Sequence, residues 1–373
     1  MVLRKKLISL MLCLVMILVL VPAPVSAATV GGGCGDNLTW ELDDAGTLTI
    51  SGTGAMAEYV LSSEVPWNEY LGQIKQVRIP AGLTVINSVG ASSWGRVPVW
   101  VDAANQSYSS DSYGVLFNKN KTVLISAPWG MSGTYTVPNT VEELAEGAFW
   151  SSDLSEIILP DSLEIIGERA FSSCHNLYEI VVPRRVYSIG VGAFSTGYIY
   201  GYIWVDEDNL NFSNDSYGVL FNKDKTILLQ APSGLTGSYT VPDTVRIIDK
   251  EAFAGVLFLT EIIIPESVTR IEECAFFLAM RLEVIRGGKN VKYIGRAAFS
   301  NCQELSDIYY DGTMNQALRI YVEPDNESFL NATFHFQPAI SGDMDGDGDK
   351  DTDDAVYLLL NVMFGDEDYP LAQ

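Results

Sequence analysis

The sequence LTEIIIPESVTRI, at residues 259–271, belongs to a repeat that recurs along most of the chain. Its proline, Pro265, stands ten residues before the pair Ala275 and Phe276. Four more prolines stand ten residues before an Ala-Phe pair, namely Pro138, Pro160, Pro183 and Pro242. Successive prolines of this set are 22 or 23 residues apart, with one longer interval after Pro183. A fixed period of this length predicts a solenoid, in which each repeat forms one coil.

One repeat contains the signals for two short strands and a corner. Side chains alternate between the two faces in residues 259–264, as a strand requires, and Pro265 ends the strand because it has no N–H to donate. Residues 267–271 then form a second extended segment on the opposite wall, and the pair Ala275 and Phe276 fills the corner. A single coil cannot bury its own apolar face, so stacked coils share one core. The predicted fold class is mainly β, a solenoid of short parallel strands.

A β-hairpin is expected before the first repeat. Residues 38–42 and 47–50 alternate apolar and polar side chains and are separated by the turn sequence DDAG. The first coil of a solenoid needs a cover, and this hairpin is a natural cap. The glycine run at residues 31–33 is expected to be a leader. The first repeat strand is expected at residues 74–80, in a degenerate coil that has no Ala-Phe corner.

Two longer units interrupt the simple repeats. Residues 101–140 match residues 205–244 at a constant offset of 104, and both copies contain DSYGVLFNK. In the first copy, residues 114–117 and 122–126 should pair as strands. Each unit is therefore expected to be an enlarged coil with a hairpin on one side, which explains the long interval between prolines.

Composition and charge restrict the classes of partner and the cell compartment. The net charge is −24 and the pI is about 4.3, which excludes nucleic acid as an expected partner because phosphate binding needs a basic surface. Residues 1–27 have the charged start, apolar centre and small-residue end of a signal peptide. The alternative is an uncleaved membrane anchor. No other segment is long and apolar enough to span a bilayer, so no membrane span is expected after cleavage.

Few residues offer catalytic chemistry. After signal cleavage the cysteines would be Cys34, Cys174, Cys274 and Cys302. Cys174 and Cys302 share one repeat position and are expected to be small buried hydrophobes, not a disulfide framework. The histidines are His175 and His335. Because His175 directly follows Cys174, their side chains should diverge, and His335 fits a structural place in a closing strand. An enzymatic hypothesis would need a cluster of titratable groups that the sequence does not display, so no enzyme is expected.

The outward positions of the long strands form a candidate partner surface. These positions, two and four residues before each proline or its equivalent, hold Glu156 and Ile158, Glu179 and Val181, Glu261 and Ile263, Val284 and Arg286, and Asp307 and Tyr309. Stacked strands place equivalent residues about 4.8 Å apart. Ile158, Val181 and Ile263 would then form an aliphatic stripe beside an acidic ladder, which is typical of a binding face. The alternative is the ordinary sheet surface of an acidic protein.

Residues 343–354 read DMDGDGDKDTDD and have the spacing of a twelve-residue calcium loop. The expected Ca²⁺ ligands are Asp343, Asp345, Asp347, Asp349, Asp351 and Asp354. Asp349 would contribute its backbone carbonyl, and Gly348 allows the sharp turn at position 6. Without metal these carboxylates repel one another, so binding and local folding should be coupled. Residues 355–364 are predicted to form a helix after the loop. The alternative is a solvated acidic linker.

These motifs resemble two known families. The repeat, with its Ile-Pro-x-Ser-Val core and Ala-Phe corner, resembles the BspA-type leucine-rich repeats of bacterial surface and secreted proteins over roughly residues 34–337. That resemblance implies an adhesive or protein-binding role without catalytic residues. The tail, through GDMDGDGD and DDAVYLLL, resembles the first calcium repeat of a type I dockerin, a family that carries two such repeats. It implies docking onto a cohesin module of a scaffold protein. Recognition would use Thr352 and Asp353, with Leu359 and Leu360 next.

The sequence thus predicts a leucine-rich repeat solenoid with an N-terminal hairpin cap and a small calcium loop-helix module. The segments are 1–27 signal peptide, 28–63 hairpin cap, 64–337 solenoid with closing strands at 318–322 and 332–336, 338–342 linker, and 343–373 partial dockerin with one calcium repeat. We expect a secreted, extracellular or cell-surface-associated binding protein that recognises a protein or glycan through its solenoid. The alternative is a non-catalytic component of a cohesin-dockerin multi-enzyme complex involved in polysaccharide degradation.

Overall fold

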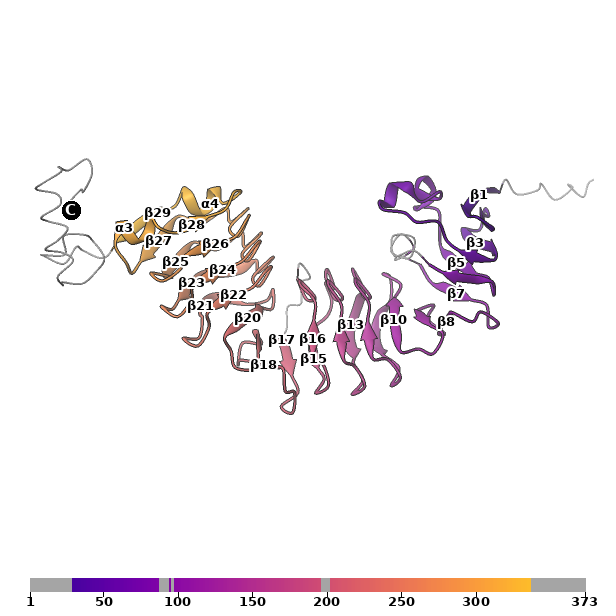
Figure 1. The fold of residues 1–373 in the computed structure, drawn as a ribbon, viewed down its shortest axis with the longest axis horizontal. Coiled ribbons are helices and arrows are strands. Elements are labelled where there is room, and N and C mark those ends of the chain that lie inside the picture. Colours follow the sequence, from indigo (N-terminus) through magenta and orange to yellow (C-terminus); the bar gives the residue numbers. More distant parts are fainter. Residues whose placement is uncertain (1–28, 87–93, 95–96, 196–201, 337–373) are drawn as a thin grey trace, which may run out of the picture.

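The computed structural model describes residues 29–86, 94, 97–195 and 202–336. These residues form a single row of coils that curves into an arc (Figure 1). Each regular coil contributes one longer strand to one wall and one two-residue strand to the opposite wall. In the C-terminal arm of the arc, the long strands lie on the outer side and the two-residue strands lie on the inner side (Figure 1).

The first coils carry a five-stranded sheet in the order β1-β2-β3-β5-β7. Its strands are β1 (Val30–Gly35), β2 (Leu38–Leu42), β3 (Thr47–Gly52), β5 (Gln76–Ile79) and β7 (Val99–Val101). The opposite side holds β4 (Gly54–Ala55) paired with β6 (Leu83–Val85), and the short 3-10 turns η1 (Ser62–Glu64) and η2 (Asn68–Tyr70) lie between β4 and β5 in the chain. The expected hairpin is β2 and β3, and β3 joins the first repeat strand, β5, by parallel pairing.

The glycine run that was expected to be a leader is instead part of β1, which pairs with β2. The reason is the close approach of the two backbones. A Cβ on Gly31 would lie 2.5 Å from the carbonyl oxygen of Trp40, and one on Gly32 would lie 3.2 Å from the Trp40 Nε1 atom. Only glycine lets the edge strand pack this closely against a buried tryptophan.

The central coils follow the expected repeat. Their long strands are β11 (Ser132–Thr136), β13 (Asp153–Ile158), β15 (Glu179–Val182) and β17 (Tyr202–Val205). The opposite wall is a six-stranded sheet of β8 (Tyr108–Ser110), β9 (Leu116–Asn118), β10 (Val123–Ser126), β12 (Glu143–Leu144), β14 (Ile165–Ile166) and β16 (Ser188–Ile189). The two-residue strands β12, β14 and β16 stack in parallel, as the Ser-Val-x-x-Ile segments predicted.

The C-terminal coils repeat this arrangement. Their long strands, all parallel, are β21 (Thr236–Thr240), β23 (Phe258–Ile264), β25 (Val284–Gly287), β27 (Asp307–Tyr310) and β29 (Thr333–Phe336). The other wall contains β18 (Phe212–Asn214), β19 (Leu220–Asn222), β20 (Ile227–Gln230), β22 (Ile247–Ile248), β24 (Arg270–Ile271), β26 (Tyr293–Ile294) and β28 (Tyr321–Val322). Successive coils pair Ile262 with Ile285 and Ile285 with Ile308, so the repeats stack in register.

The closing segment differs from the prediction of two plain strands. The segment 318–322 contributes only the two-residue strand β28, and a short helix, α3 (Met314–Ala317), precedes it. Thr313 caps this helix, because its side chain accepts the Gln316 N–H. A second short helix, α4 (Glu327–Leu330), lies before β29 and brings Phe329 against the last corner ring, Phe299.

The enlarged coils contain the predicted hairpin. β9 pairs with β10 antiparallel, and β19 pairs with β20 in the same way in the second copy. Asp111 explains why DSYGVLFNK occurs twice. Its Oδ1 accepts the backbone N–H groups of Tyr113 and Val115, and its Oδ2 accepts the Tyr135 hydroxyl at 2.7 Å. Gly114 has a φ of +78°, and a Cβ there would lie 2.4 Å from Pro98. The motif therefore holds a tight turn in each enlarged coil.

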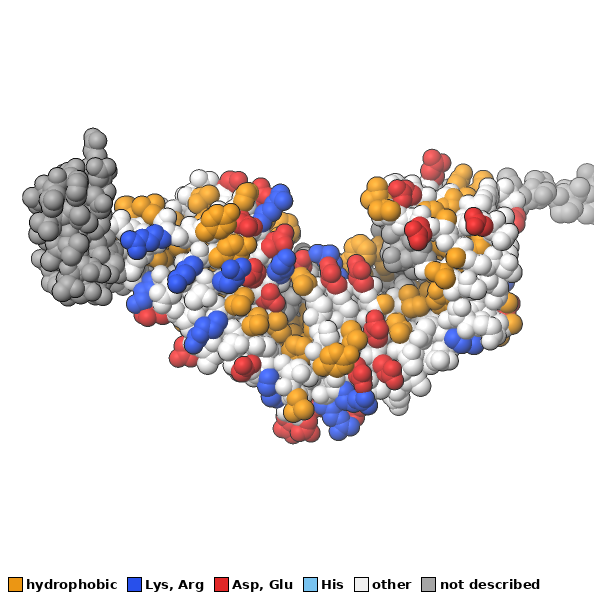
Figure 2. Space-filling model, in the orientation of Figure 1, with side chains coloured by type: hydrophobic (Ala, Val, Ile, Leu, Met, Phe, Trp, Pro, Cys, Tyr) orange, Lys and Arg blue, Asp and Glu red, His pale blue; other side chains and the backbone are white. Residues whose placement is uncertain are grey.

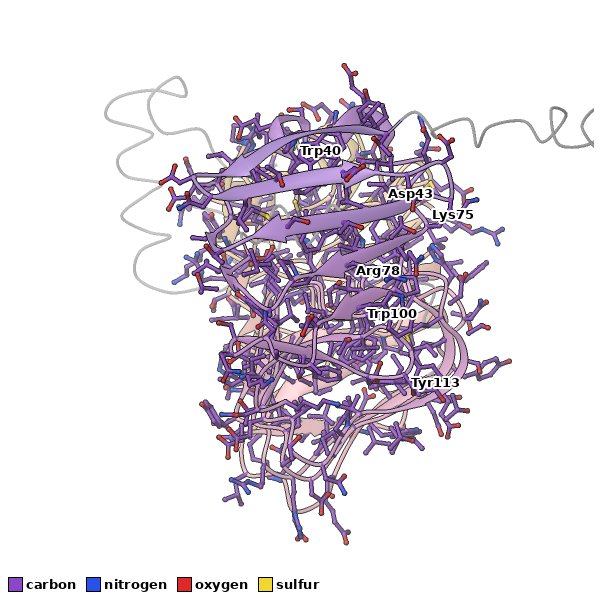
Figure 3. The ribbon with its side chains drawn as sticks, turned by 90° about the vertical axis from the view of Figure 1, so that its right-hand side faces the viewer. Trp40, Asp43, Lys75, Arg78, Trp100 and Tyr113 are labelled. Carbon is purple, nitrogen blue, oxygen red and sulfur yellow. The ribbon has the colours of Figure 1, made fainter. Side chains whose placement is uncertain are left out.

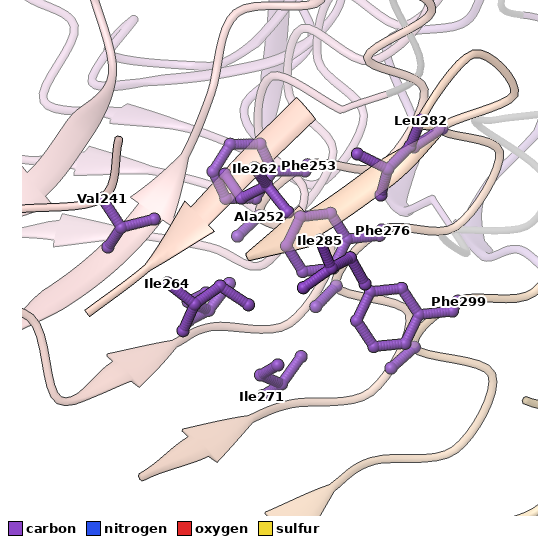
Figure 4. Packing of buried hydrophobic residues seen from close by; sticks show 14 of the residues in the cluster. Val241, Ala252, Phe253, Ile262, Ile264, Ile271, Phe276, Leu282, Ile285 and Phe299 are labelled. Atoms are coloured by element: carbon purple, nitrogen blue, oxygen red, sulfur yellow. The ribbon is translucent and has the colours of Figure 1, made fainter. Parts of the chain in front are cut away.

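The corner phenylalanines fill the core in stacked runs. The central run is Phe149, Phe171 and Phe194, with ring centroids 5.6 and 5.4 Å apart. The C-terminal run is Phe253, Phe276 and Phe299, with neighbouring centroids 4.8 and 4.9 Å apart (Figure 4). Phe329 of α4 continues the stack at 5.1 Å from Phe299. The central and C-terminal runs are separated by the second enlarged coil. The enlarged coil between the runs places Ala231 at the corner, where its N–H donates to the Ala252 carbonyl as a corner phenylalanine does, and the ring that this coil packs against Phe253 is Tyr239 of β21, at a centroid distance of 6.0 Å.

A polar bridge joins the central and C-terminal coils where the stacking is interrupted. The Glu251 carboxylate accepts from the Arg169 guanidinium at 2.8 Å and from the Ser195 hydroxyl at 2.9 Å. Arg169 also pairs with its neighbour Glu168 at 3.0 Å. These contacts span 82 positions of sequence and link coils on either side of the enlarged unit.

Candidate binding surface

The outward side chains of the long strands, which we call the outer wall, form the candidate binding surface. Each long strand buries alternate residues and leaves the others facing out. Backbone pairing aligns the outward residues in rows, namely Thr49, Arg78 and Trp100; Thr136 and Ile158; Val181 and Trp204; and Thr240, Ile263, Arg286, Tyr309 and His335. Figure 2 views the coils from the side and shows acidic, basic and hydrophobic side chains mixed over the central and C-terminal coils.

The central part of the outer wall carries the most exposed aliphatic side chains of the expected stripe. Ile158 is 46% exposed and Val181 is 49% exposed. Val181 pairs directly with Trp204 on the next strand. On the same wall, Glu156 accepts a hydrogen bond from the Thr134 hydroxyl at 2.8 Å. This region therefore combines solvent-exposed apolar side chains with the Glu156 carboxylate, which is already hydrogen-bonded.

Ile263 lies in a different part of the outer wall. It belongs to β23, in the C-terminal sheet, where it stands between Thr240 and Arg286 and is partly buried. The central strands and β23 are separated by the enlarged coil. The structure thus places Ile158 and Val181 on one set of coils and Ile263 on another, instead of in one unbroken stripe.

A charged and aromatic ladder occupies the C-terminal outer wall. The Arg286 guanidinium lies 4.2 Å from the centre of the Tyr309 ring, and Tyr309 stacks on His335 with centroids 4.4 Å apart. Arg286 also pairs with Glu261 at 2.5 Å, and His335 Nε2 lies 2.7 Å from the carboxylate of Asp307. The Ser238 hydroxyl and Arg286 lower the pKa of Glu261. Hydrogen bonding to His335 is the main cause of the lowered pKa of Asp307.

This ladder was not predicted from the sequence. The expected acidic positions Glu261 and Asp307 are present, but Glu261 pairs with Arg286 and Asp307 is hydrogen-bonded to His335, each from an adjacent coil. The signal was available, because Arg286, Tyr309 and His335 recur at nearly the repeat spacing. On the opposite wall, Arg270 likewise lies 4.1 Å from the centre of the Tyr293 ring, a contact that was not predicted either.

Two of the cysteines lie in the core, as the sequence predicted. Cys174 and Cys302 are buried, and burial raises the pKa of each thiol to about 12, so neither forms a thiolate at neutral pH. Each thiol lies near the backbone carbonyl of a corner phenylalanine. His175, next to Cys174, is exposed. In the described ranges, His, Cys, Asp and Glu side chains form no group of three or more that could hold a metal ion.

Several expected features lie outside the described residues. The six calcium ligands, the recognition residues Thr352 and Asp353, and the helix at 355–364 fall in the segment 337–373. The expected signal peptide, 1–27, also lies outside them. Within the part of the chain that the structure describes, no helix has both the length and the apolar character needed to cross a membrane.

Comparison with known proteins confirms the repeat architecture. Residues 133–217 and 234–319 match the family model for the BspA type leucine rich repeat region, in six copies. A search among curated proteins finds no match. A leucine-rich repeat protein from Eubacterium ventriosum has a crystal structure with a similar fold, at 24% sequence identity and a TM-score of 0.52, over 84% of this chain and 86% of that chain.

Two further solved structures are similar over most of their own length. A leucine-rich cell surface protein from Faecalibacterium prausnitzii is 21% identical, with a TM-score of 0.44, over 80% of this chain and 98% of that chain. The pneumococcal vaccine antigen PcpA is 15% identical, with a TM-score of 0.47, over 84% of this chain and 94% of that chain. The family match and the E. ventriosum structure together establish a mainly β, leucine-rich repeat solenoid.

Proposed function

We propose that this protein, whose residues 133–217 and 234–319 match BspA-type leucine-rich repeats, is a secreted, non-catalytic binding protein. The solenoid recognises an extracellular protein or glycan, and the acidic tail is a calcium-dependent docking module. The signal-like residues 1–27 support secretion or association with the cell surface, because they have the three parts of a cleavable leader. The net charge of −24 supports a ligand other than nucleic acid.

The observation that carries the binding role is the exposure of aliphatic side chains on the outer wall. Ile158 and Val181 stay nearly half exposed on strands whose other side is fully packed. Apolar side chains that a sheet leaves in water often mark partner surfaces. A solenoid also suits recognition, because its stacked coils present one extended surface that can contact a large ligand.

Serine substitution of the aliphatic positions tests this role. The wild type and the triple variant I158S, V181S, I263S would be applied to a glycan array and to a panel of purified extracellular matrix proteins. We expect the wild type to bind at least one member and the triple variant to lose that binding. The control is Leu210→Ser, which removes a side chain that is 80% exposed in the loop between β17 and β18. Unchanged binding by the triple variant, or no binding by the wild type, would contradict the proposal.

A second candidate function rests on the tail. The spacing of the aspartates at residues 343–354 favours calcium binding, and the resemblance to a dockerin favours docking onto a cohesin-bearing scaffold. In this candidate the protein is a non-catalytic component of a complex involved in polysaccharide degradation, and Thr352 and Asp353 contact the cohesin. Ca²⁺ ligation would couple to folding of the tail, because the carboxylates repel one another without metal.

Deletion of the tail separates the two functions. A chain that ends at residue 342 and the full chain would be tested against a purified cohesin module and against the ligand found on the arrays, each with calcium and with EDTA. Retention of the array ligand by the shortened chain supports the solenoid as the binding element. Calcium-dependent capture of cohesin by the full chain alone supports docking, whereas EDTA-insensitive or absent capture contradicts it.

A further inference from the structure

The N-terminal part of the outer wall contains an open groove that the candidate stripe does not include. The groove has a volume of about 630 Å³ and lies across β3, β5 and β7. Its polar and aromatic lining comprises Thr49, Ser51, Gln76, Arg78, Trp100 and Asp102. Figure 3 shows Arg78 and Trp100 on neighbouring strands of this sheet, viewed from outside the arc. The groove is therefore an open site with a mixed polar and apolar lining, built on the strands of one sheet.

The side chains of Arg78 and Trp100 lie next to each other in the groove. Thr49 pairs with Arg78, and Arg78 pairs with Trp100, so the guanidinium stands in one row between a hydroxyl and an indole. The Trp100 Nε1–H donates to Gln76 Oε1 at 3.0 Å, and Gln76 Nε2 in turn donates to the Thr47 hydroxyl at 2.9 Å. This chain of hydrogen bonds holds the indole in place before any ligand arrives.

Arg78 differs from the arginine of the C-terminal ladder. Arg286 is paired with Glu261 and lies over the Tyr309 ring, so its charge is already compensated. Arg78 is exposed, and no hydrogen bond or ion pair holds its guanidinium within the described part of the chain. Arg78 therefore provides a local positive charge beside the held indole, which can attract an anion although the protein as a whole has a net charge of −24.

We propose that this groove binds a carboxylated sugar ring, such as a uronic or sialic acid residue of an acidic glycan. Arg78 pairs with the sugar carboxylate through two parallel hydrogen bonds, which its planar fork favours. The C–H face of the pyranose ring packs on the indole of Trp100, because the negative face of an aromatic ring attracts the partial positive charge of C–H groups. Thr49, Ser51 and Asp102 then hydrogen-bond to the sugar hydroxyls.

The second enlarged coil provides a matched control within the same chain. Trp204 lies 104 positions after Trp100, at the equivalent position of the duplicated unit. Its neighbour in the row is Val181, where the first copy has Arg78. The second copy thus keeps the aromatic ring and lacks the cation. If the Arg78 guanidinium binds the sugar carboxylate, the site around Trp204, which has Val181 in place of Arg78, does not bind the same sugar.

Titration calorimetry with the full chain tests the proposal. The probes are a galacturonic acid trisaccharide and sialyllactose, which separate the two sources of the carboxylate, and neutral lactose is the reference. We expect at least one acidic probe to bind, to quench tryptophan fluorescence, and to bind more weakly as salt is raised. The variant R78Q should weaken this binding about tenfold or more, and W100A should weaken it similarly, while W204A leaves it unchanged.

Each outcome decides the question. Arg78 and Trp204 are not core residues, so unchanged melting temperatures of R78Q and W204A would show that these changes leave the fold intact. Failure of both acidic probes to bind, equal affinity for lactose, or an unaffected R78Q would overturn the proposal. The inference deepens the proposed binding role by naming a ligand class, but the tests are distinct, because I158S, V181S and I263S do not touch this groove. The solenoid can therefore keep its binding role if the groove fails.

Discussion

Replacement of Phe276 by alanine removes one full level of the aromatic core. The ring is fully buried, and it stacks on Phe253 at 4.8 Å and on Phe299 at 4.9 Å, both nearly parallel. A buried Phe→Ala change destabilises by about 3–5 kcal/mol, through lost burial and the cavity left behind. Because two stacked pairs are lost together, each worth about 0.5–1.5 kcal/mol, we expect about 4–5 kcal/mol.

The size and the location of the effect can be measured separately. Chemical denaturation gives the loss in unfolding free energy, and hydrogen exchange read by mass spectrometry gives its position along the chain. Coils contact mainly their sequence neighbours, so exchange should accelerate in peptides around residues 253–299 and stay unchanged in residues 30–101. Phe194→Ala should be milder, about 3 kcal/mol, because among the described residues Phe194 stacks on one ring, that of Phe171.

An exposed ring is the matched control for this experiment. Tyr178 is 74% exposed, and Tyr178→Ala should change the unfolding free energy by no more than about 0.5 kcal/mol. Two results would refute the reasoning about the core. One is a loss of less than about 1 kcal/mol for Phe276→Ala. The other is an acceleration of exchange spread evenly over all coils, which would mean that the coils do not behave as neighbouring units.

The other predictions concern polar contacts. Tyr135→Phe leaves Asp111 Oδ2 without its 2.7 Å partner and should cost about 1–3 kcal/mol in thermal or chemical unfolding, and Tyr239→Phe should cost the same in the second copy. His335→Ala should raise the pKa of Asp307 toward its ordinary 3.8, as read by carboxyl-carbon NMR. Because the folded pKa is lowered, this pair stabilises the fold above pH 3.8 and loses its contribution as the pH falls through the lowered value, so the variant should flatten that acid dependence.

The regular coils could be predicted from sequence because their signals are local and periodic. The proline that ends each long strand and the Ala-Phe pair at each corner recur at a fixed spacing, so the position of Phe276 follows from that of Pro265. Alternation within a strand then fixes which side chains face out, and the exposure of Ile158 and Val181 agrees with it. These inferences needed no knowledge of how distant coils meet.

The features that were missed depend on contacts between coils. β1 contains a glycine run. Glycines have no side chains that could alternate between apolar and polar, so the sequence does not indicate a strand there. Only the pairing with β2, for example of Gly31 with Glu41, shows that the segment is a strand. The expected aliphatic stripe is interrupted because the second enlarged coil lies between Val181 and Ile263. The alternation of outward residues within each strand does not show how the strands of distant coils are placed. Arg78 and Trp100 are 22 residues apart, the repeat spacing, but the first coil lacks the Ala-Phe corner that marked the register elsewhere.

The duplicated hairpin explains how one solenoid contains three cores. Among the described residues, buried side chains group into an N-terminal, a central and a C-terminal cluster. In β9, Leu116 packs into the N-terminal cluster and its neighbour Phe117 into the central one. In β19, Leu220 packs into the central cluster and Phe221 into the C-terminal one. Successive side chains of a strand point to opposite faces, so β9 and β19 each lie between two clusters and contribute side chains to both. The sequence DSYGVLFNK is identical in both copies. In each copy its residues form one tight turn and a strand that is packed on both faces, and these two requirements restrict the choice of residues.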